Sequence, residues 1–197
     1  SYTRFQEAEL GSDVDVLVLG SSHAYRGYDP RIFYEANLKM FNLGSSSQTP
    51  VQTEYLANKY LDHFKPNIVI LDVYPILFKS DGVESVIDLL SNSKLDKELI
   101  DLSLQNRDIR IYNTLIYRYC KDVFNFDKDY KESLHQKNGD SYIKGGFVES
   151  KSKFESKNSY DPAHYTFLPA QKIAFSNIVE KLKSRNIPYI ILQSPIP

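Results

Sequence analysis

Residues 16–30, VLVLGSSHAYRGYDP, decide the fold of this chain. The stretch begins with four apolar residues, which is typical of a strand that is covered on both faces, as in a parallel sheet. The apolar run stops at Gly20, and two serines and a histidine follow at once. Asp29 and Pro30 then suit the N-cap and the first position of a short helix. A strand that passes through a glycine turn into a helix indicates an α/β unit.

The same alternation continues along the next part of the chain. Short strands are predicted over residues 40–43 and 67–73, and the first strand is predicted over residues 14–19. An amphipathic helix is predicted between the later two strands, with Thr49 as its N-cap and Gln52 completing a capping box. The order β-α-β-α-β predicts a parallel sheet with right-handed crossovers and with helices on both faces. We expect the first strand to be central, between the other two.

The pattern changes in the middle of the chain and then returns. Residues 79–165 are polar and weakly periodic, so they are interpreted as a mostly helical and loop insertion. An amphipathic helix then leads into a fourth strand over residues 187–193. We therefore predict one α/β domain over residues 1–197, with its core in residues 13–78 and 168–197. The chain begins without Met and ends just after a predicted interior strand, so we expect missing segments both upstream and downstream.

Composition excludes several classes of protein. The 197 residues are 42% hydrophobic and 25% charged, which is ordinary for a globular protein. The net charge of −1 gives no support for binding to nucleic acid or to an acidic membrane surface. No run of about 18 apolar residues is present, so membrane association is expected only through segments outside this chain. Cys120 is the only cysteine, and an intrachain disulfide is therefore impossible.

The sequence also gives no sign of a cofactor. The four histidines do not have the spacing of metal ligands. Neither a Gly-x-Gly-x-x-Gly motif nor a P-loop is present, so a nucleotide site has no support. We therefore predict neither a metal nor an organic cofactor.

Three polar segments are expected at the carboxyl ends of the strands, where open parallel sheets bind their ligands. They are residues 20–23, 42–45 and 72–75. A serine raised on a glycine turn exposes its hydroxyl, and nearby backbone N–H groups can stabilise an oxyanion. The alternative is that Ser21 and Ser22 only cap the following helix, since serine is favoured at that position. Both interpretations stay open at this point.

Two stretches together resemble a known family. VDVLVLGSSHAYRG and FNLGSSSQTP resemble the first two sequence blocks of the SGNH/GDSL hydrolases, in the branch where Gly-Ser-Ser or Gly-Thr-Ser replaces Gly-Asp-Ser. That branch includes membrane-anchored envelope proteins linked to acyl transfer onto cell-surface polymers. The resemblance covers residues 13–78 and, more loosely, residues 169–195. It implies a flavodoxin-like three-layer α/β/α sandwich and a serine esterase or O-acyltransferase that acts on an ester or an acylated surface glycan. It also implies a cell-envelope location, anchored by an upstream segment, although a cytoplasmic location stays open.

The resemblance assigns roles to two residues of this sequence. By the match to Gly-x-Ser, Ser22 is the nucleophile and Ser21 is not. Gly44 matches the glycine of the second block, whose N–H joins the N–H of Ser22 in the oxyanion hole. The family also places an asparagine after the third strand, but this chain has LDVYP there, and only the hydroxyl of Tyr74 could donate in its place.

The catalytic base is harder to place. The family carries Asp-x-x-His after its last strand, whereas the only such spacing here, Asp161 with His164, precedes the fourth strand. We therefore predict that His164 lies on the same rim as Ser22 but too far away to bond its hydroxyl. We expect the true Asp and His beyond Pro197.

A second function is compatible with the same residues. The chain could be a non-catalytic SGNH-fold protein that serves as a binding or scaffold component of an envelope assembly. The absent asparagine and the unplaced Asp and His favour this alternative. The sequence does not identify the acyl group, the direction of acyl transfer or the oligomeric state.

Overall fold

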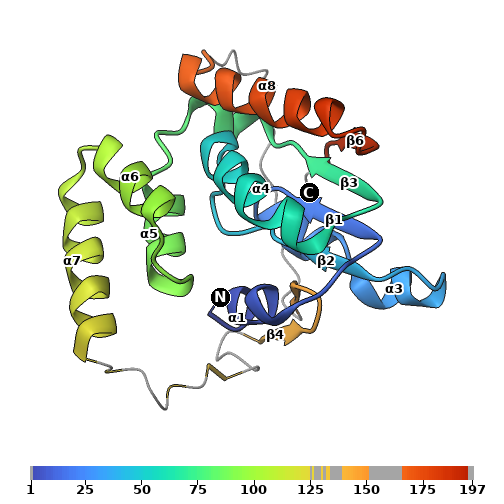
Figure 1. Cartoon of the computed structure of the whole chain (residues 1–197), viewed down its shortest axis with the longest axis horizontal. Coiled ribbons are helices and arrows are strands. Elements are labelled where there is room, and N and C mark those ends of the chain that lie inside the picture. The colour runs from blue at the N-terminus through green and yellow to red at the C-terminus, as the bar shows by residue number, and fades with distance from the viewer. Residues whose placement is uncertain are drawn as a thin grey trace, which may run out of the picture.

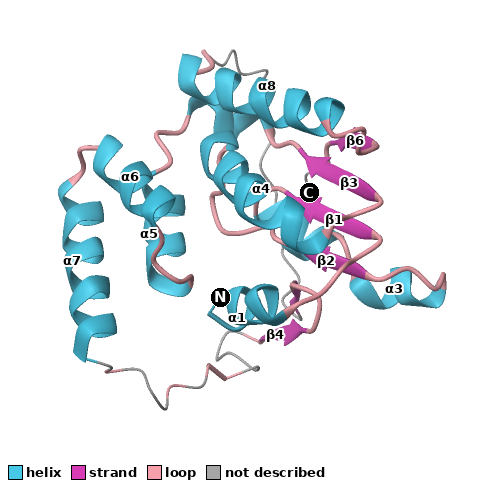
Figure 2. Ribbon diagram, in the orientation of Figure 1, coloured by secondary structure: helices cyan, strands magenta, loops and turns pink. Residues whose placement is uncertain are grey.

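The computed structural model describes residues 2–124, 126, 130, 132–133, 139–150 and 166–194. At its centre lies a four-stranded parallel sheet with the strand order β2-β1-β3-β6 (Figures 1 and 2). The strands are β1 (Val16–Leu19), β2 (Met40–Asn42), β3 (Ile68–Asp72) and β6 (Tyr189–Leu192). The prediction of a parallel α/β sheet with the first strand between the second and third is confirmed. Each strand is shorter than predicted by one to three residues at its ends, as is usual for boundaries taken from sequence.

Helices cover both faces of the sheet, so the domain has three layers. Side chains alternate along a strand, and β1 shows this directly. Its Leu17 and Leu19 pack in a large cluster with α1 (Tyr2–Leu10), α4 (Pro50–Phe64) and α8 (Pro169–Ser184). Its Val16 and Val18 pack on the opposite face, in a smaller cluster with α2 (Ser22–Gly27) and α3 (Pro30–Glu35). A strand that is apolar at every position is therefore buried on both sides.

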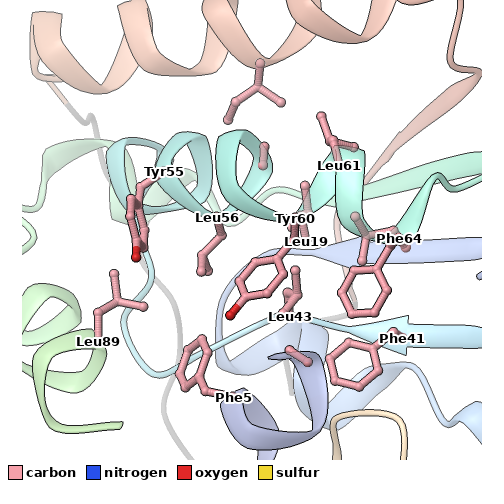
Figure 3. Close-up of a cluster of buried hydrophobic side chains, with 14 of the residues drawn as sticks. Phe5, Leu19, Phe41, Leu43, Tyr55, Leu56, Tyr60, Leu61, Phe64 and Leu89 are labelled. Carbon is pink, nitrogen blue, oxygen red and sulfur yellow. The ribbon is translucent and has the colours of Figure 1, made fainter. Parts of the chain in front are cut away.

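The larger cluster is built around an aromatic group (Figure 3). The Phe41 and Phe64 rings stack with their centroids 4.9 Å apart, and Tyr60 stacks on Phe64 at 5.8 Å. Leu56 and Leu61 of α4 are almost fully buried beside them. Burial of each large apolar side chain stabilises the fold by about 1.5–3 kcal/mol. This cluster therefore holds α4 onto the sheet.

The predicted insertion is helical in its first half. It contains α5 (Val83–Asn92), α6 (Lys97–Gln105) and α7 (Ile109–Phe124), after a short 3-10 helix, η1 (Pro75–Lys79). Its second half contains an antiparallel hairpin, β4 (Asp140–Ile143) with β5 (Phe147–Ser150), among the described residues. Leu89 of α5 and Phe5 of α1 lie in the main core (Figure 3). Helices α1 and α5 therefore belong to the core, although both lie outside the residues predicted to form it, 13–78 and 168–197. The periodicity of a sequence predicts that a helix has a buried face, but it does not predict which element that face contacts.

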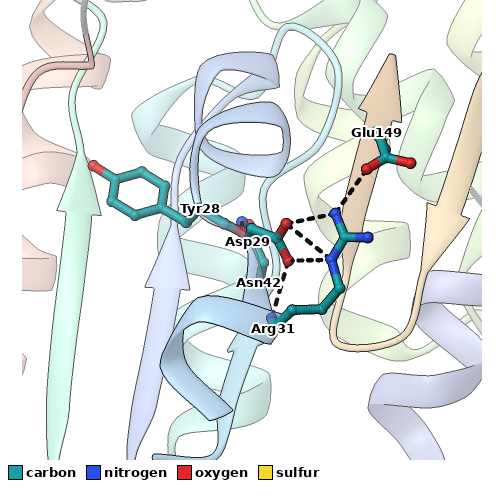
Figure 4. A network of polar contacts seen from close by, with 5 residues as sticks. All are labelled: Tyr28, Asp29, Arg31, Asn42 and Glu149. Carbon is teal, nitrogen blue, oxygen red and sulfur yellow. Dashed lines mark hydrogen bonds and ion pairs between the residues drawn. The ribbon is translucent and has the colours of Figure 1, made fainter. Parts of the chain in front are cut away.

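The hairpin closes the outer edge of β2. The backbone N–H of Asn42 donates to the carbonyl of Gly145 at 2.8 Å. At Gly146, whose φ is +89°, a Cβ would lie 2.0 Å from the carbonyl oxygen of Asn42, so only glycine fits. Arg31 adds a second link, because its guanidinium binds both Asp29 and Glu149 of β5 (Figure 4). Covering an edge strand with a loop or hairpin is one way in which proteins limit pairing with another chain.

The two predicted helix starts differ in detail. Asp29 is the N-cap of α3, and its carboxylate accepts the N–H of Arg31 at 2.9 Å, as predicted. Thr49 precedes α4, but its side chain makes no cap hydrogen bond. The Thr49 hydroxyl bonds the side chain of Gln52 instead. The predicted capping box is therefore wrong. The Thr49 and Gln52 side chains pair with each other, whereas a capping box needs each of them to bond the other residue's backbone N–H.

A charged cluster joins α1, α4 and α6. Lys59 Nζ lies 3.0 Å from Glu9 Oε1 and 3.0 Å from Asp96 Oδ2. Burial acts to raise the pKa of Asp96, but the N–H of Leu99, the Tyr55 hydroxyl and Lys59 outweigh it and hold that pKa below its ordinary value. In the same way, Lys59 and a tyrosine hydroxyl hold the pKa of Glu9 below its ordinary value against the effect of burial. Both carboxylates therefore stabilise the fold in their ionised form.

This cluster predicts a stability that depends on acidic pH. A carboxyl group whose pKa is lowered by folding stabilises the protein above its unfolded pKa, near 4, and loses that contribution as pH falls through the folded pKa. We expect Asp96→Asn to cost about 1 kcal/mol at pH 7, since the pair is partly exposed, while Asn still caps α6. The difference from the parent protein should shrink toward pH 3 in urea unfolding. Asp101→Asn, on the exposed side of α6, is the matched control; a gap that stays constant with pH would contradict the assignment.

Candidate active site

The turn that follows β1 is tightly packed against the end of β3. A Cβ at Gly20 would lie 2.7 Å from the carbonyl oxygen of Asp72 and 2.9 Å from the Cβ of Ala24. A larger residue at position 20 would push the first turn of α2 away from the sheet. The glycine therefore sets where the serines stand, at the carboxyl edge of the central strand.

The two serines of this turn have different environments. Ser21 is 1% exposed and is the N-cap of α2, where its Oγ accepts the N–H of His23 at 3.4 Å. Ser22 is the first residue of α2 and is partly exposed. The capping interpretation therefore applies to Ser21 and leaves the hydroxyl of Ser22 accessible.

Ser22 opens into a groove of about 540 Å³ between α2 and the end of β6. This volume is typical of small-molecule sites. The groove lies at the carboxyl ends of the strands, where parallel sheets bind ligands. Its lining comes from two segments far apart in sequence: Ser22, His23, Arg26, Gly27, Tyr28, Leu192, Gln193 and Ser194. A larger groove of about 620 Å³, beside α1, α3 and the hairpin, includes neither Ser22 nor Gly44.

A buried carboxylate is hydrogen-bonded to two of the side chains that line this groove. Asp72 is the last residue of β3 and is 5% exposed. Its Oδ2 accepts a hydrogen bond from the Tyr28 hydroxyl at 2.9 Å and a short one from the Ser194 hydroxyl. Burial raises the pKa of Tyr28 to about 12, and the charge of Asp72 adds to this effect. The phenol therefore stays protonated near neutral pH and donates to the carboxylate.

The Tyr28–Asp72 bond gives a prediction about stability. Tyr28→Phe removes one donor to a buried carboxylate without changing the packed volume of the ring, so it is expected to cost about 1.5 kcal/mol. Urea unfolding at pH 7 measures this cost. Tyr34→Phe is the matched control, because Tyr34 is 78% exposed, and it should change nothing. Equal stability of the Tyr28→Phe protein and its parent would show that the bond contributes nothing net.

Sequence analysis placed Asp72 at the carboxyl ends of the strands, within the segment 72–75, but did not predict that Tyr28 and Ser194 bind it. Asp72 has a weak sequence signal, since it is a charged residue that directly follows an apolar strand. Tyr28 and Ser194 have none, because they lie 44 and 122 residues away from it along the chain. Only the parallel packing of β1, β3 and β6 brings the three side chains together.

Gly44 lies beside the serine turn, but its N–H is already bonded. A Cβ at this position would lie 2.8 Å from the carbonyl oxygen of Ser21 and 2.9 Å from the Cβ of Ala24. However, the N–H of Gly44 donates to Asn42 Oδ1 at 2.9 Å, and the residue is buried. Asn42 in turn donates from Nδ2 to the carbonyl of Ala24 at 2.8 Å. The predicted oxyanion role does not fit this arrangement, because the local asparagine is the acceptor for that amide.

Among the described residues, no side chain is placed to act as a base toward Ser22. The ring of His23 lies edge-on to Tyr74, with centroids 4.2 Å apart, and its Nδ1 is 3.4 Å from the Oγ of Ser21, not of Ser22. Within the residues that the structure describes, no histidine is hydrogen-bonded to the hydroxyl of Ser22. Asp161 and His164 lie outside the described residues, so the prediction about the position of His164 stays a prediction.

Buried polar atoms without partners gather at this rim. Of five such side-chain atoms in the described part of the chain, three follow the ends of β2 and β3: Ser45 Oγ, Gln48 Oε1 and Asp72 Oδ1. Leaving a polar atom buried and unpaired costs about 1–3 kcal/mol, so such atoms are rare in proteins and call for an explanation.

Two further classes of site were sought in the described ranges. No group of three or more His, Cys, Asp or Glu side chains is arranged there to hold a metal ion. None of the helices within those ranges is both long enough and apolar enough to cross a bilayer.

Comparison with known proteins yields little. No family model matches the chain, and no curated protein matches it. One solved structure that is similar to it is described as that of a gut microbial diltiazem-metabolizing enzyme. The two share 13% sequence identity with a TM-score of 0.29, over 93% of this chain and 38% of the other. The chain thus spans well under half the length of that protein, and a likeness this slight carries no argument about chemistry.

Proposed function

We propose that this chain is a serine hydrolase or O-acyltransferase domain of SGNH type, which acts through Ser22 on an ester or an acylated surface glycan. One observation carries the proposal. Of two adjacent serines at the carboxyl end of the central strand, Ser21 is buried as a helix cap, while Ser22 faces a groove of about 540 Å³. The resemblance of this turn to the first sequence block of the family independently assigns the nucleophile to Ser22.

The chemistry would proceed through an acyl-enzyme. The hydroxyl of Ser22 attacks the ester carbonyl and gives its proton to a base, and the carbonyl oxygen becomes an oxyanion. The N–H of Ser22 has no acceptor within its own helix, since it belongs to the first turn, so it can bond that oxyanion. Collapse of the intermediate expels the alcohol and leaves an ester on Ser22. Water or a sugar hydroxyl then attacks this ester and releases the serine.

The base is assigned by resemblance alone. The family order places Asp-x-x-His after the last strand of the sheet, and no such pair lies among the described residues. The polar side of the groove suits a hydroxyl-rich acceptor, because Ser194 and Tyr28 present hydroxyl groups and Arg26 is held there by an ion pair to Asp140 at 2.8 Å. A location in the cell envelope is part of the same proposal and has the same basis.

A second candidate function is a non-catalytic protein that binds an acylated glycan in the same groove. Two observations favour it: the N–H of Gly44 is bonded to Asn42, and no described histidine reaches Ser22. Such a protein would hold the ligand without forming a covalent intermediate.

A serine-directed fluorophosphonate probe distinguishes the enzyme from the non-catalytic binding protein. It is added to the full-length protein, and the labelled peptide is identified by mass spectrometry. Labelling at Ser22 supports the enzyme. The binding candidate instead predicts no labelling, together with binding of an acetylated oligosaccharide that weakens when Arg26→Ala opens the groove wall.

A further inference from the structure

A polar cavity of about 250 Å³ lies where the first helix meets the insertion. Helix α1 packs against α5, and the carboxylate of Glu7 in α1 accepts a hydrogen bond from the Tyr142 hydroxyl of β4 at 2.6 Å (Figure 1). Residues from α1, α2, α5, the hairpin and the loop after β2 line the cavity, and all of its lining residues except Val148 have polar side chains. It is a different space from the groove at Ser22, although Arg26 lines both.

Arg4 of α1 lines this cavity and leaves most of its donors unused. The residue is only 2% exposed. Its Nε donates to the carbonyl of Gly146 at 3.1 Å, and its guanidinium lies 4.6 Å from the centroid of the Tyr25 ring. A guanidinium also carries N–H donors on both Nη atoms, and none of these is hydrogen-bonded to a described residue. Arginine is almost never so deeply buried unless it is paired, so these donors leave a place for an acceptor.

A carboxylate oxygen in the same cavity has no partner either. Asp88 of α5 accepts a hydrogen bond from Asn92 Nδ2 through its Oδ1, at 2.9 Å. Its Oδ2 is buried and bonds no group in the part of the chain that the structure describes. Burial lowers the pKa of Arg4, and nearby acidic groups, Asp88 among them, offset this effect only in part. Among the described residues no ion pair joins Arg4 to Asp88, so the two charges line one cavity without contact.

The other charged groups of the cavity are bonded within the protein. Arg26 Nη2 lies 2.8 Å from Asp140 Oδ2. Glu132 accepts hydrogen bonds from the backbone N–H and from the hydroxyl of Thr3, both at 2.8 Å. The lining contains three carboxylates and two guanidiniums, so it has no surplus of positive charge that would favour a simple anion. What it lacks is one acceptor and one donor.

From these observations we infer that the cavity binds a small zwitterion, with the chemistry of a free α-amino acid. The Arg4 guanidinium donates to the carboxylate of this ligand, in the fork geometry that suits the pair, and Asp88 Oδ2 accepts from its ammonium group. A ligand with only one of these groups leaves either Arg4 or Asp88 unpaired. The volume is below the range of about 300–1,000 Å³ that is typical of drug-sized ligands, which favours a ligand of few atoms.

Calorimetric titration of the full chain with glycine, L-alanine and L-serine tests this inference. At least one of them should bind at one site per chain, with a dissociation constant of about 1 mM or lower. Propionate and ethylamine each keep one of the two charged groups of alanine, so each should bind at least tenfold more weakly than the amino acid. Ser22→Ala should not change this binding, because Ser22 does not line the cavity. The result is therefore independent of the proposed hydrolase or acyltransferase activity.

Substitutions of the two unpaired groups test the assigned contacts. Asp88→Asn keeps the size of the side chain and removes its charge, so it should weaken binding of the amino acid at least tenfold without lowering the thermal stability. Arg4→Lys keeps a cation without the fork and should weaken binding as well; if that variant does not fold, Asp88→Asn decides the question. Asp101→Asn, which removes the same charge from the exposed side of α6, is the matched control and should bind like the parent.

Three results would overturn the inference. The first is that none of the three amino acids binds to the folded parent protein. The second is unchanged binding by the Asp88→Asn protein, which would place the ligand elsewhere. The third is that glucose binds as tightly as the amino acids, since the occupant would then be a neutral hydroxyl compound.

Discussion

Ser22→Ala is expected to abolish covalent labelling of the full-length protein by a fluorophosphonate probe. The loss should be complete, because removing a nucleophile removes the covalent step itself. Ser22 is the accessible serine of the turn, and no described side chain is hydrogen-bonded to its hydroxyl, so Ala should leave the fold unchanged. In-gel fluorescence and intact mass measure the label, and thermal unfolding checks the fold.

Two neighbouring serines provide controls for this prediction. Ser46→Ala should leave labelling unchanged, because Ser46 is an exposed loop residue. Ser21→Ala should lower stability by about 1 kcal/mol, as the loss of a helix cap does, and still leave most of the labelling. Full labelling of the Ser22→Ala protein would assign the nucleophile elsewhere. Absence of labelling in the parent protein as well would favour the binding function.

Gly44→Ala is expected to lower the free energy of unfolding by about 2–3 kcal/mol, as forced overpacking of a well-packed site does. The added Cβ would lie 2.8 Å from the carbonyl oxygen of Ser21, 2.9 Å from the Cβ of Ala24 and 3.0 Å from Asn42 Oδ1. The first two atoms cannot rotate away, and the Asn42 amide is held by its hydrogen bond to the carbonyl of Ala24, so the serine turn has to move away from β2. Labelling at Ser22 should therefore fall together with stability.

Gly27→Ala is the matched control for this substitution. A Cβ there would meet only the hydroxyl of Ser194, at 3.3 Å, and residue 27 is helical. Alanine is favoured over glycine in a helix by up to about 1 kcal/mol, so this variant should be as stable as the parent or slightly more so. Urea unfolding measures both variants. A Gly44→Ala protein as stable as the Gly27→Ala protein would show that the two turns are not in close contact.

Local regularities explain why much of the fold could be predicted. The four apolar residues before Gly20 predict a strand that is buried on both faces, and this strand is β1. Asp29 before Pro30 predicts a helix start, because the Asp side chain caps the first turn and the proline ring suits the first helical position. Both effects are confined to a single turn of the helix. Each of these signals depends on residues that are close together in the chain.

The site could be predicted only in part. The glycine and serine pattern places a nucleophilic turn at the carboxyl edge of the sheet, and this depends on residues 20–23 alone. It does not tell which serine is buried, because burial of Ser21 results from the packing of α2 against β2 and β3. Nor does it show that the Gly44 N–H is bonded, since Asn42 turns back on its own strand end to accept it.

The sequence by itself determined the alternation of strands and helices, the parallel sheet and the turn that carries Ser22. These follow from periodicity and capping, which operate over one or two turns of the chain. Tertiary structure alone decided which polar groups share the rim, because Tyr28, Asp72 and Ser194 meet only when three strands align. It also decided that Ile116, Tyr117 and Phe124 of α7 are exposed, because in this helix, which packs against α5, Ile111 and Arg118 are the buried residues.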